Sequence, residues 1–307
     1  MNADVLEAIK KSAAVPSMPQ VIVRFLEVIQ DPSFEYTELV KVLSVDPGTV
    51  SDLLRLTNSA LFGVRREVTN LRHALTLLGP RRTRSMVLGR YLVATLGDDV
   101  SHGLDLSYFW RRSLSSAVLA TRFASVVAPR LRDEAFISGL LADIGIPILA
   151  EAFPTPYAEL AGRYAPRTKP FDCADELKAV GVTHAEVSAM VLDDWGLPDL
   201  ICNAVRRHHS APEPDDDAAI LSRILGATDR LAVVLCEAPD PETVGQVCVE
   251  ATDAIGMDLK VFYDLLGDIE NDIEELASTL RIDVISSTVY ALIAKTIQGK
   301  LEVTSAG

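Results

Sequence analysis

The sequence has few aromatic residues and no long apolar run, and both absences restrict the possible folds. Phe, Trp and Tyr make up 6% of the 307 residues, whereas 49% of the residues are hydrophobic. An aliphatic core of this kind suits packed helices better than a β-sandwich. The most apolar stretch, residues 144–152, is too short to cross a bilayer. We therefore expect an all-α protein without a membrane segment.

Cysteine is also scarce, and the amino terminus resembles no targeting signal. The sequence shows neither the Cys-x-x-Cys spacing of metal sites nor the density of a disulfide framework. The four cysteines are Cys173, Cys202, Cys236 and Cys248. The first residues lack the basic start and the apolar core of a secretory signal. Buried thiols in a reducing compartment account for this pattern, and we predict a cytoplasmic location.

Positive charge is in deficit overall but is concentrated in one region. The net charge is −14, yet residues 65–132 contain 12 Lys or Arg and 4 Asp or Glu, whereas residues 213–307 contain 6 and 19. Because phosphate neutralisation supplies most nonspecific affinity for nucleic acids, such binding is not expected. The basic region suits an anion, an acidic partner or the chain's own acidic end. Its candidate surface residues, for which solvation alone is the simpler interpretation, are Arg65, Arg66, Arg81, Arg82 and Arg84.

Residues typical of helix starts and stops divide the chain into helices. Asp46-Pro47 predicts an N-cap followed by proline at the first helical position. Gly79-Pro80 predicts a break between two helices, and Pro129 ends an aliphatic helix that begins near Ser107. Thr183 predicts the cap of a helix that reaches Trp195.

The later segments are also predicted to be helical, with one exception. Apolar positions 136, 140, 144 and 148 predict one helix from Asp133 onward, and Pro198 opens a helix that reaches His208. Four prolines predict irregular structure over residues 154–175. Beyond a linker at residues 211–217, the spacing of apolar residues predicts helices over 217–236, 241–255, 258–280 and 283–298.

Polar residues that suit a metal site occur in otherwise apolar segments. Asp143 and Asp229 each lie in an apolar run, where a carboxylate is costly unless it is paired, hydrogen-bonded or bound to a metal. Three of the five histidines are His184, His208 and His209. Two acids with two or three imidazoles form a ligand set for a hard or borderline cation. As alternatives, His184 supports the start of its own helix, and one of the adjacent pair is buried while the other is exposed.

One motif and its neighbours resemble a known superfamily. Leu140-Leu-Ala-Asp-Ile-Gly145 resembles the His-Asp signature helix of the HD phosphohydrolases, with Ala142 in place of the histidine. The similarity is greatest to the HD-related output domain (HDOD) family, over about residues 15–235. The other matching motifs, in order, are Val15-Pro-Ser-Met-Pro-Gln-Val21, Ser44-Val-Asp-Pro47, Asn58-Ser-Ala-Leu-Phe-Gly63, Leu75-Thr-Leu-Leu-Gly79, Trp110-Arg-Arg-Ser113, Phe136-Ile-Ser-Gly-Leu-Leu141, Thr183-His-Ala-Glu186, Trp195-Gly-Leu-Pro198 and His208-His209.

The resemblance implies a multi-helix HD-like core with helical additions at both ends. We predict an N-terminal helix or tail over residues 1–14 and an HDOD domain over 15–212. Within that domain, residues 15–100 form an N-terminal helical module and residues 101–212 the HD-like core. An acidic C-terminal extension, residues 213–307, completes the core.

The resemblance also implies that the metal site is degenerate. Arg112 stands where the superfamily has its first histidine, and Ala142 stands at the signature histidine. The remnant site then consists of Arg112, Ala142, Asp143, His184, His208, His209 and Asp229. We predict that Arg112 pairs with Asp143 and that no metal binds. If a divalent metal binds, its predicted ligands are Asp143, His184, His208 or its neighbour, and Asp229.

HDOD proteins are regulatory modules of bacterial signalling, so the resemblance implies a non-catalytic module with a signalling protein as partner. Two alternatives stay open at this point. One is a metal-dependent phosphohydrolase or phosphodiesterase with a rearranged site. The other is a nucleotide-binding receptor that uses the degenerate pocket and the basic region near residues 65–90.

Overall fold

The structure is a computed structural model that describes residues 3–11, 19–62, 67–95, 103–165, 172–210, 216–237, 240–280, 282 and 287–305. The helices, in chain order, are α1 (Ala3–Lys11), α2 (Gln20–Gln30), α3 (Tyr36–Leu43), α4 (Pro47–Asn58), α5 (Leu71–Thr95), α6 (Leu106–Val127), α7 (Arg132–Leu141), α8 (Gly145–Ala152), α9 (Ala158–Arg163), α10 (Cys173–Val180), α11 (His184–Asp194), α12 (Asp199–Arg206), α13 (Asp217–Glu237), α14 (Pro241–Ala254), α15 (Leu259–Leu280) and α16 (Ser287–Ser305). No strand occurs among these residues, and the predicted all-α class is confirmed.

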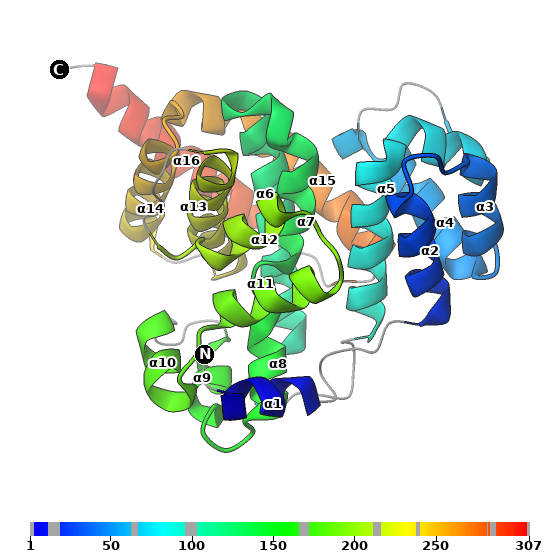
Figure 1. Cartoon of the computed structure of the whole chain (residues 1–307). Coiled ribbons are helices and arrows are strands. Elements are labelled where there is room, and N and C mark those ends of the chain that lie inside the picture. The colour runs from blue at the N-terminus through cyan, green and yellow to red at the C-terminus, as the bar shows by residue number, and fades with distance from the viewer. Residues whose placement is uncertain are drawn as a thin grey trace.

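Helices α2 to α5 form a group on one side of the molecule (Figure 1). The Asp46 side chain accepts a hydrogen bond from the Gly48 backbone and caps α4, as predicted. Gly79 has a φ of 72°, which breaks α5 into two helical pieces at the predicted position. The first predicted family motif falls partly outside the described residues, as do Gly63, Arg65, Arg66 and most of the linker.

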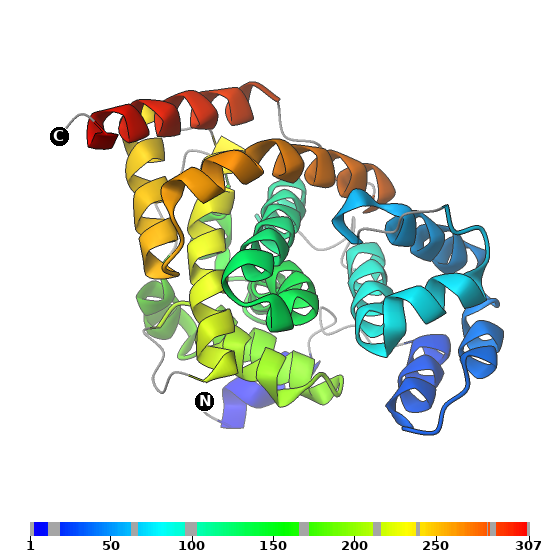
Figure 2. The same ribbon diagram turned by 90° about the horizontal axis from the view of Figure 1, so that it is seen from above.

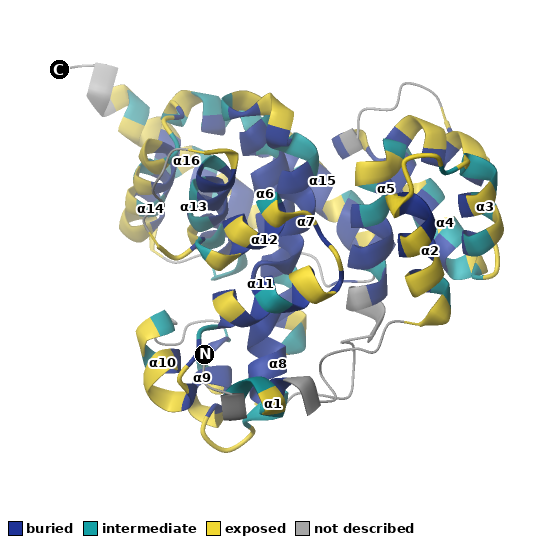
Figure 3. Cartoon of the chain, viewed as in Figure 1, coloured by how far each residue is buried: buried dark blue, intermediate teal, exposed yellow. Residues whose placement is uncertain are grey.

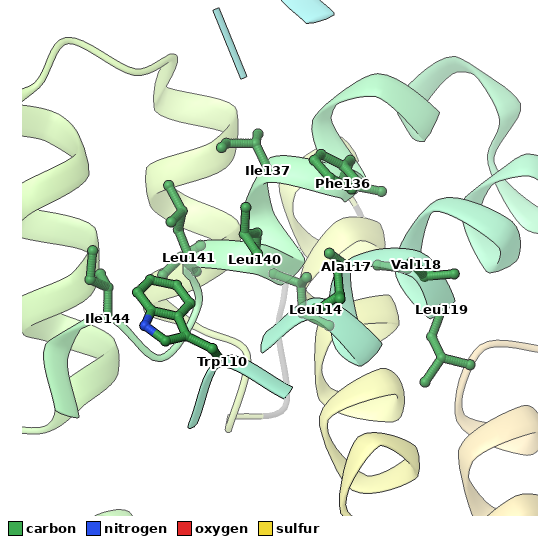
Figure 4. Close-up of a cluster of buried hydrophobic side chains, with 14 of the residues drawn as sticks. Trp110, Leu114, Ala117, Val118, Leu119, Phe136, Ile137, Leu140, Leu141 and Ile144 are labelled. Carbon is green, nitrogen blue, oxygen red and sulfur yellow. The ribbon is translucent and has the colours of Figure 1, made fainter. Parts of the chain in front are cut away.

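Helices α6 and α7 pack against each other at the centre of the molecule. Figure 4 shows Trp110, Leu114 and Val118 of α6 in one cluster of buried apolar side chains with Phe136 and Leu140 of α7. A Cβ atom at Gly139 would lie 2.8 Å from the Ala117 Cα, so the two backbones approach unusually closely. Both helices are buried along almost their whole length (Figure 3).

The single helix predicted from Asp133 onward is wrong, because the structure breaks it. Helix α7 ends at Leu141 and α8 begins at Gly145, with a turn between them. Asp143 lies in this turn. The stretch from Pro129 to Ala152 is long and apolar enough to cross a membrane by composition, but 89% of its most apolar window is buried within the fold. Its apolar character is therefore explained by core packing.

Two further predictions need correction, one for residues 154–175 and one for the helix that opens at Pro198. Residues 154–175, predicted to be irregular, contain α9 and the start of α10, because Pro154 and Pro156 lie in the turn before α9. Helix α12 ends at Arg206, so His208 and His209 lie in a turn after the helix rather than within it. The Thr183 cap of α11 is confirmed, and Glu186 completes a reciprocal capping box.

The C-terminal helices pack against the core. Helix α13 runs along α6, while α15 crosses α6 and reaches α4 (Figure 2). Asp272 on α15 is fully buried and accepts a hydrogen bond from Arg122 Nε at 2.6 Å. This contact joins the acidic end of the chain to one residue of the basic region. The proposed domain boundaries themselves stay a prediction.

Candidate functional site

Two turns and one helix start, far apart in the sequence, bring Asp143 and the three histidines together. Asp143 comes from the α7–α8 turn, His184 is the first residue of α11, and the adjacent His208 and His209 follow α12. The Asp143 Oδ1 atom lies 3.3 Å from His208 Nε2 and 3.5 Å from His184 Nε2. The Nε2 atoms of His184 and His209 are 2.9 Å apart. We call these four residues the His/Asp cluster.

Glycine allows the backbones around the cluster to approach closely. A Cβ atom at Gly145 would collide with the carbonyl of His184, and one at Gly226 would lie 2.6 Å from the carbonyl oxygen of His208. The Gly145 backbone also donates to Ser188 Oγ at 2.8 Å, which joins α8 to α11. The backbone positions of both histidines are therefore set by direct contact with a neighbouring helix, α8 for His184 and α13 for His208.

Acceptors outside the cluster orient two of its imidazoles. Glu176 Oε2 lies 2.8 Å from His184 Nδ1, and the Val205 carbonyl oxygen lies 2.6 Å from His208 Nδ1. A carboxylate and a carbonyl only accept, so each Nδ1 carries the proton. When the two imidazoles are neutral, their Nε2 atoms therefore present lone pairs to the centre of the cluster.

The cluster therefore gathers acceptors where a cation fits. Asp143 Oδ1 and His208 Nε2 are buried, and no hydrogen-bond partner for either atom occurs among the described residues. The ligand atoms of all four residues lie within 4.8 Å of one another. Around a tetrahedral ion with bonds of about 2.1 Å, ligand atoms are roughly 3.4 Å apart. The contacts of 2.9, 3.3 and 3.5 Å match this spacing. Three imidazole nitrogens and one carboxylate suit zinc or another late transition metal.

Arg112 does not pair with Asp143 as predicted, because Tyr164 lies between them. Its Nη2 atom is 2.5 Å from Asp229 Oδ1, and its guanidinium stacks 4.4 Å from the centre of the Tyr164 ring. The Tyr164 hydroxyl donates to Asp143 Oδ2 at 2.7 Å. Asp229 is thus bound by arginine, and His209 takes its place in the predicted ligand set. Ala142 is buried in the same turn as Asp143.

These contacts shift the pKa values of the buried groups in opposite directions. Burial alone would lower the pKa of Arg112, but Tyr164 and the carboxylates around it raise that pKa well above its ordinary value. Burial would raise the pKa of Asp143, but His208, His184 and Arg112 together hold it well below its ordinary range. Both groups are therefore charged at neutral pH.

The pKa values of His184 and His209 also shift in opposite directions. Burial would lower the pKa of His184, but Glu176 raises it above its ordinary value. Desolvation of the His209 ring where its Nε2 atom enters the cluster, together with the two neighbouring imidazoles, lowers the pKa of His209 well below its ordinary value. His208 is buried and His209 is exposed, as predicted for this pair, although the His209 Nε2 atom faces the cluster.

A pocket of about 380 Å³ opens beside the cluster. Its wall combines Arg112, Arg163 and Arg230 with Asp172, Asp229 and Glu237. The mixture of charges gives the pocket no strong preference for an anion. Tyr108 and Tyr164 add aromatic surface.

The predicted anion surface is partly used within the chain. Arg81 lies 3.0 Å from Glu134, and Arg82 lies 2.6 Å from Asp133. Arg84 is half-buried, and desolvation lowers its pKa. Arg65 and Arg66 lie outside the described residues. Two of the three described arginines thus join α5 to α7.

The sequence profile of the HDOD domain family matches residues 15–211 of the chain. This chain belongs to the HDOD family. The suspected resemblance is thereby confirmed. An uncharacterised protein of Treponema pallidum (strain Nichols) is 26% identical over 231 residues, which is 73% of this chain and 44% of that protein. The HDOD chain thus spans less than half the length of that relative.

Solved structures share the HDOD fold. A Shewanella amazonensis SB2B protein assigned by name to the phosphohydrolases has a TM-score of 0.71 and 21% identity, covering 91% of this chain and 98% of that chain. An HDOD domain protein of unknown function from Geobacter sulfurreducens has a TM-score of 0.70 and 18% identity, covering 90% and 96%. A Marinobacter aquaeolei VT8 protein named for signal transduction has a TM-score of 0.57 and 20% identity, covering 96% and 65%. At these identities the likeness concerns the fold.

Sequence reasoning missed Tyr164, Glu176 and Tyr157. All three lie in or beside the segment that was predicted to be irregular, and all are buried. The one available signal was the pair of acids, Asp175 and Glu176, in the helix start that follows the N-cap Asp172. That pattern indicates a helix start but does not show which acid points inward.

Proposed function

We propose that this HDOD protein is a non-catalytic regulatory module of bacterial signal transduction, which acts by binding a signalling protein. The observation that supports this proposal is the ion pair between Arg112 and Asp229. It places a fixed positive charge where the resemblance assigns the first metal-binding histidine. Besides an ion in the His/Asp cluster, a second metal ion next to this guanidinium would be repelled by its charge.

A single ion at the His/Asp cluster is compatible with this role. From the sequence we expected no metal, but the convergent acceptors favour one ion held by Asp143, His184, His208 and His209. Four protein ligands fill a tetrahedral coordination shell, whereas a hydrolytic site keeps one position open for water. We therefore assign the ion a structural or regulatory role. When bound, it would neutralise the Asp143 carboxylate and hold the three imidazoles together.

A metal-dependent phosphohydrolase is the second candidate, and the His/Asp cluster is the feature that favours it. The two functions differ in a measurable way. We expect the purified wild-type protein to bind about one equivalent of metal and to leave bis(4-nitrophenyl) phosphate and cyclic dinucleotides intact. Hydrolysis by the wild type that disappears in His184→Ala would overturn the regulatory proposal.

A gain-of-function variant sharpens this test. Arg112→His combined with Ala142→His supplies both imidazoles that the HD signature has and this chain lacks. We expect the double variant to bind more metal than the wild type, measured by plasma mass spectrometry after gel filtration. Equal metal content in both proteins would show that Arg112 does not block a second ion.

A further inference from the structure

We infer that Glu176 is the positioning residue of the metal centre: it fixes the His184 ring for ligation and ties helix α10 to the ion. This inference rests on the single-ion site proposed above. Glu176 is fully buried, although it lies on α10, a short helix whose outer face is exposed. A fully buried carboxylate needs partners that compensate its desolvation.

The partners of Glu176 are all hydrogen-bond donors. Its Oε2 atom accepts from the backbone N–H and from Nδ1 of His184, each at 2.8 Å. Its Oε1 atom accepts from the Tyr157 hydroxyl at 2.5 Å. The bond to Nδ1 holds His184 in the tautomer whose Nε2 lone pair faces Asp143. Histidine ligands commonly donate their second ring N–H to a carboxylate in this way, which raises ligand basicity.

The same contacts make α10 sensitive to the centre. Glu176 connects α10 inward to His184, while the next residue, Leu177, is 51% exposed on the outer side. Arg163 of α9 also pairs with Asp175 on α10 at 2.8 Å. In Figure 1, α9 and α10 lie together at the edge of the molecule. An ion that fixes His184 therefore also steadies Glu176 and the helix that carries it.

A purely structural role for Glu176 would be to start α11, since it accepts the first backbone N–H of that helix. Thr183 provides a matched control for this possibility. Its side chain caps the same helix start by accepting from the Glu186 N–H, and its hydroxyl donates to Glu186 Oε2 rather than to the His184 ring. Thr183→Ala therefore weakens the helix start and leaves the ring orientation intact.

The test measures zinc affinity of the full-length chain by competition with a chromogenic chelator. We expect Glu176→Ala to bind zinc about 10- to 100-fold more weakly, the usual effect of losing such a partner. Glu176→Gln should lose less, because its amide oxygen keeps both bonds from His184 and its NH₂ group donates to the Tyr157 oxygen. Thr183→Ala should bind zinc like the wild type, even though its melting temperature falls.

Three further readouts separate the possible outcomes. In metal-free protein, ¹⁵N NMR should show the Nδ1–H tautomer of His184 in the wild type and Glu176→Gln, but not in Glu176→Ala. Zinc should slow hydrogen exchange of the α10 amides in the wild type but not in Glu176→Ala. Equal zinc affinity in wild type and Glu176→Ala, or an equal loss in Thr183→Ala, overturns the inference alone. A wild type that binds no zinc overturns the ion site and this inference together, whereas phosphodiester hydrolysis by the wild type bears only on the regulatory proposal.

Discussion

The Nη2 atom of Arg112 lies 2.5 Å from Oδ1 of Asp229, and the two side chains are only 9% and 17% exposed. The pair joins α6 to α13 at the wall of the pocket. Its burial makes it sensitive to the loss of one partner, because an unpaired buried charge costs far more than the pair itself contributes.

We predict that Arg112→Ala destabilises the fold by about 3–5 kcal/mol, since it leaves the buried Asp229 carboxylate without its partner. Urea unfolding followed by circular dichroism measures this loss. Arg112→Met combined with Asp229→Leu should recover most of the stability, because neither buried charge of the pair remains. A double variant as unstable as Arg112→Ala would show that the pair does more than compensate charge.

Removal of a proposed ligand should remove the metal. We expect His208→Ala to weaken zinc binding by more than about 100-fold, beyond the loss typical of an outer partner. His73→Ala is the matched control, since His73 is exposed on α5. Calorimetric titration of both variants with zinc gives the comparison. If His208→Ala binds as tightly as the control, the ion does not sit in the cluster.

Asp143 predicts a specific acid sensitivity. Its folded-state pKa is held well below the ordinary value. A depressed carboxyl pKa contributes stability that is present above about pH 4, the unfolded value, and is lost as the pH falls through the folded value. We therefore expect metal-free wild type to lose more stability below about pH 4 than Asp143→Asn does. The control is Asp253→Asn, an exposed carboxylate on α14.

The bridge between Arg122 and Asp272 tests whether α15 belongs to the core. Asp272 is fully buried and Arg122 is 19% exposed, with 2.6 Å between their bonded atoms. Arg122→Ala should cost about 3–5 kcal/mol, whereas Arg122→Leu with Asp272→Leu should be neutral or stabilising. Proteolysis of the Arg122→Ala variant should then begin near α15. Equal resistance of all three proteins would show that other contacts hold this helix.

Local sequence signals predicted the helix ends well where the deciding contact is between residues close together in the sequence. Asp46, Gly79 and Thr183 act through their own backbone neighbours, and each has the predicted effect. Where tertiary contacts decide, the predictions were wrong. The turn around Asp143 interrupts an apolar pattern that would support a continuous helix, and packing of α8 against α11 compensates the break.

The residues of the candidate site were predictable, but their pairing was not. Family motifs identified Asp143 and the three histidines. They did not reveal that Tyr164 would separate Arg112 from Asp143, since Tyr164 follows a short helix within a proline-rich segment. Glu176 was missed for the same reason, because its partner is on the next helix.

Gly145 and Gly226 have a kinetic consequence. Because α8 and α13 touch the backbone at His184 and His208, the imidazoles are in position before an ion arrives. Capture then requires no rearrangement of the chain, and zinc uptake should be a single exponential whose rate rises linearly with zinc concentration. Alanine at either glycine would push a helix away from its histidine, and uptake should then saturate at the rate at which the displaced helices return.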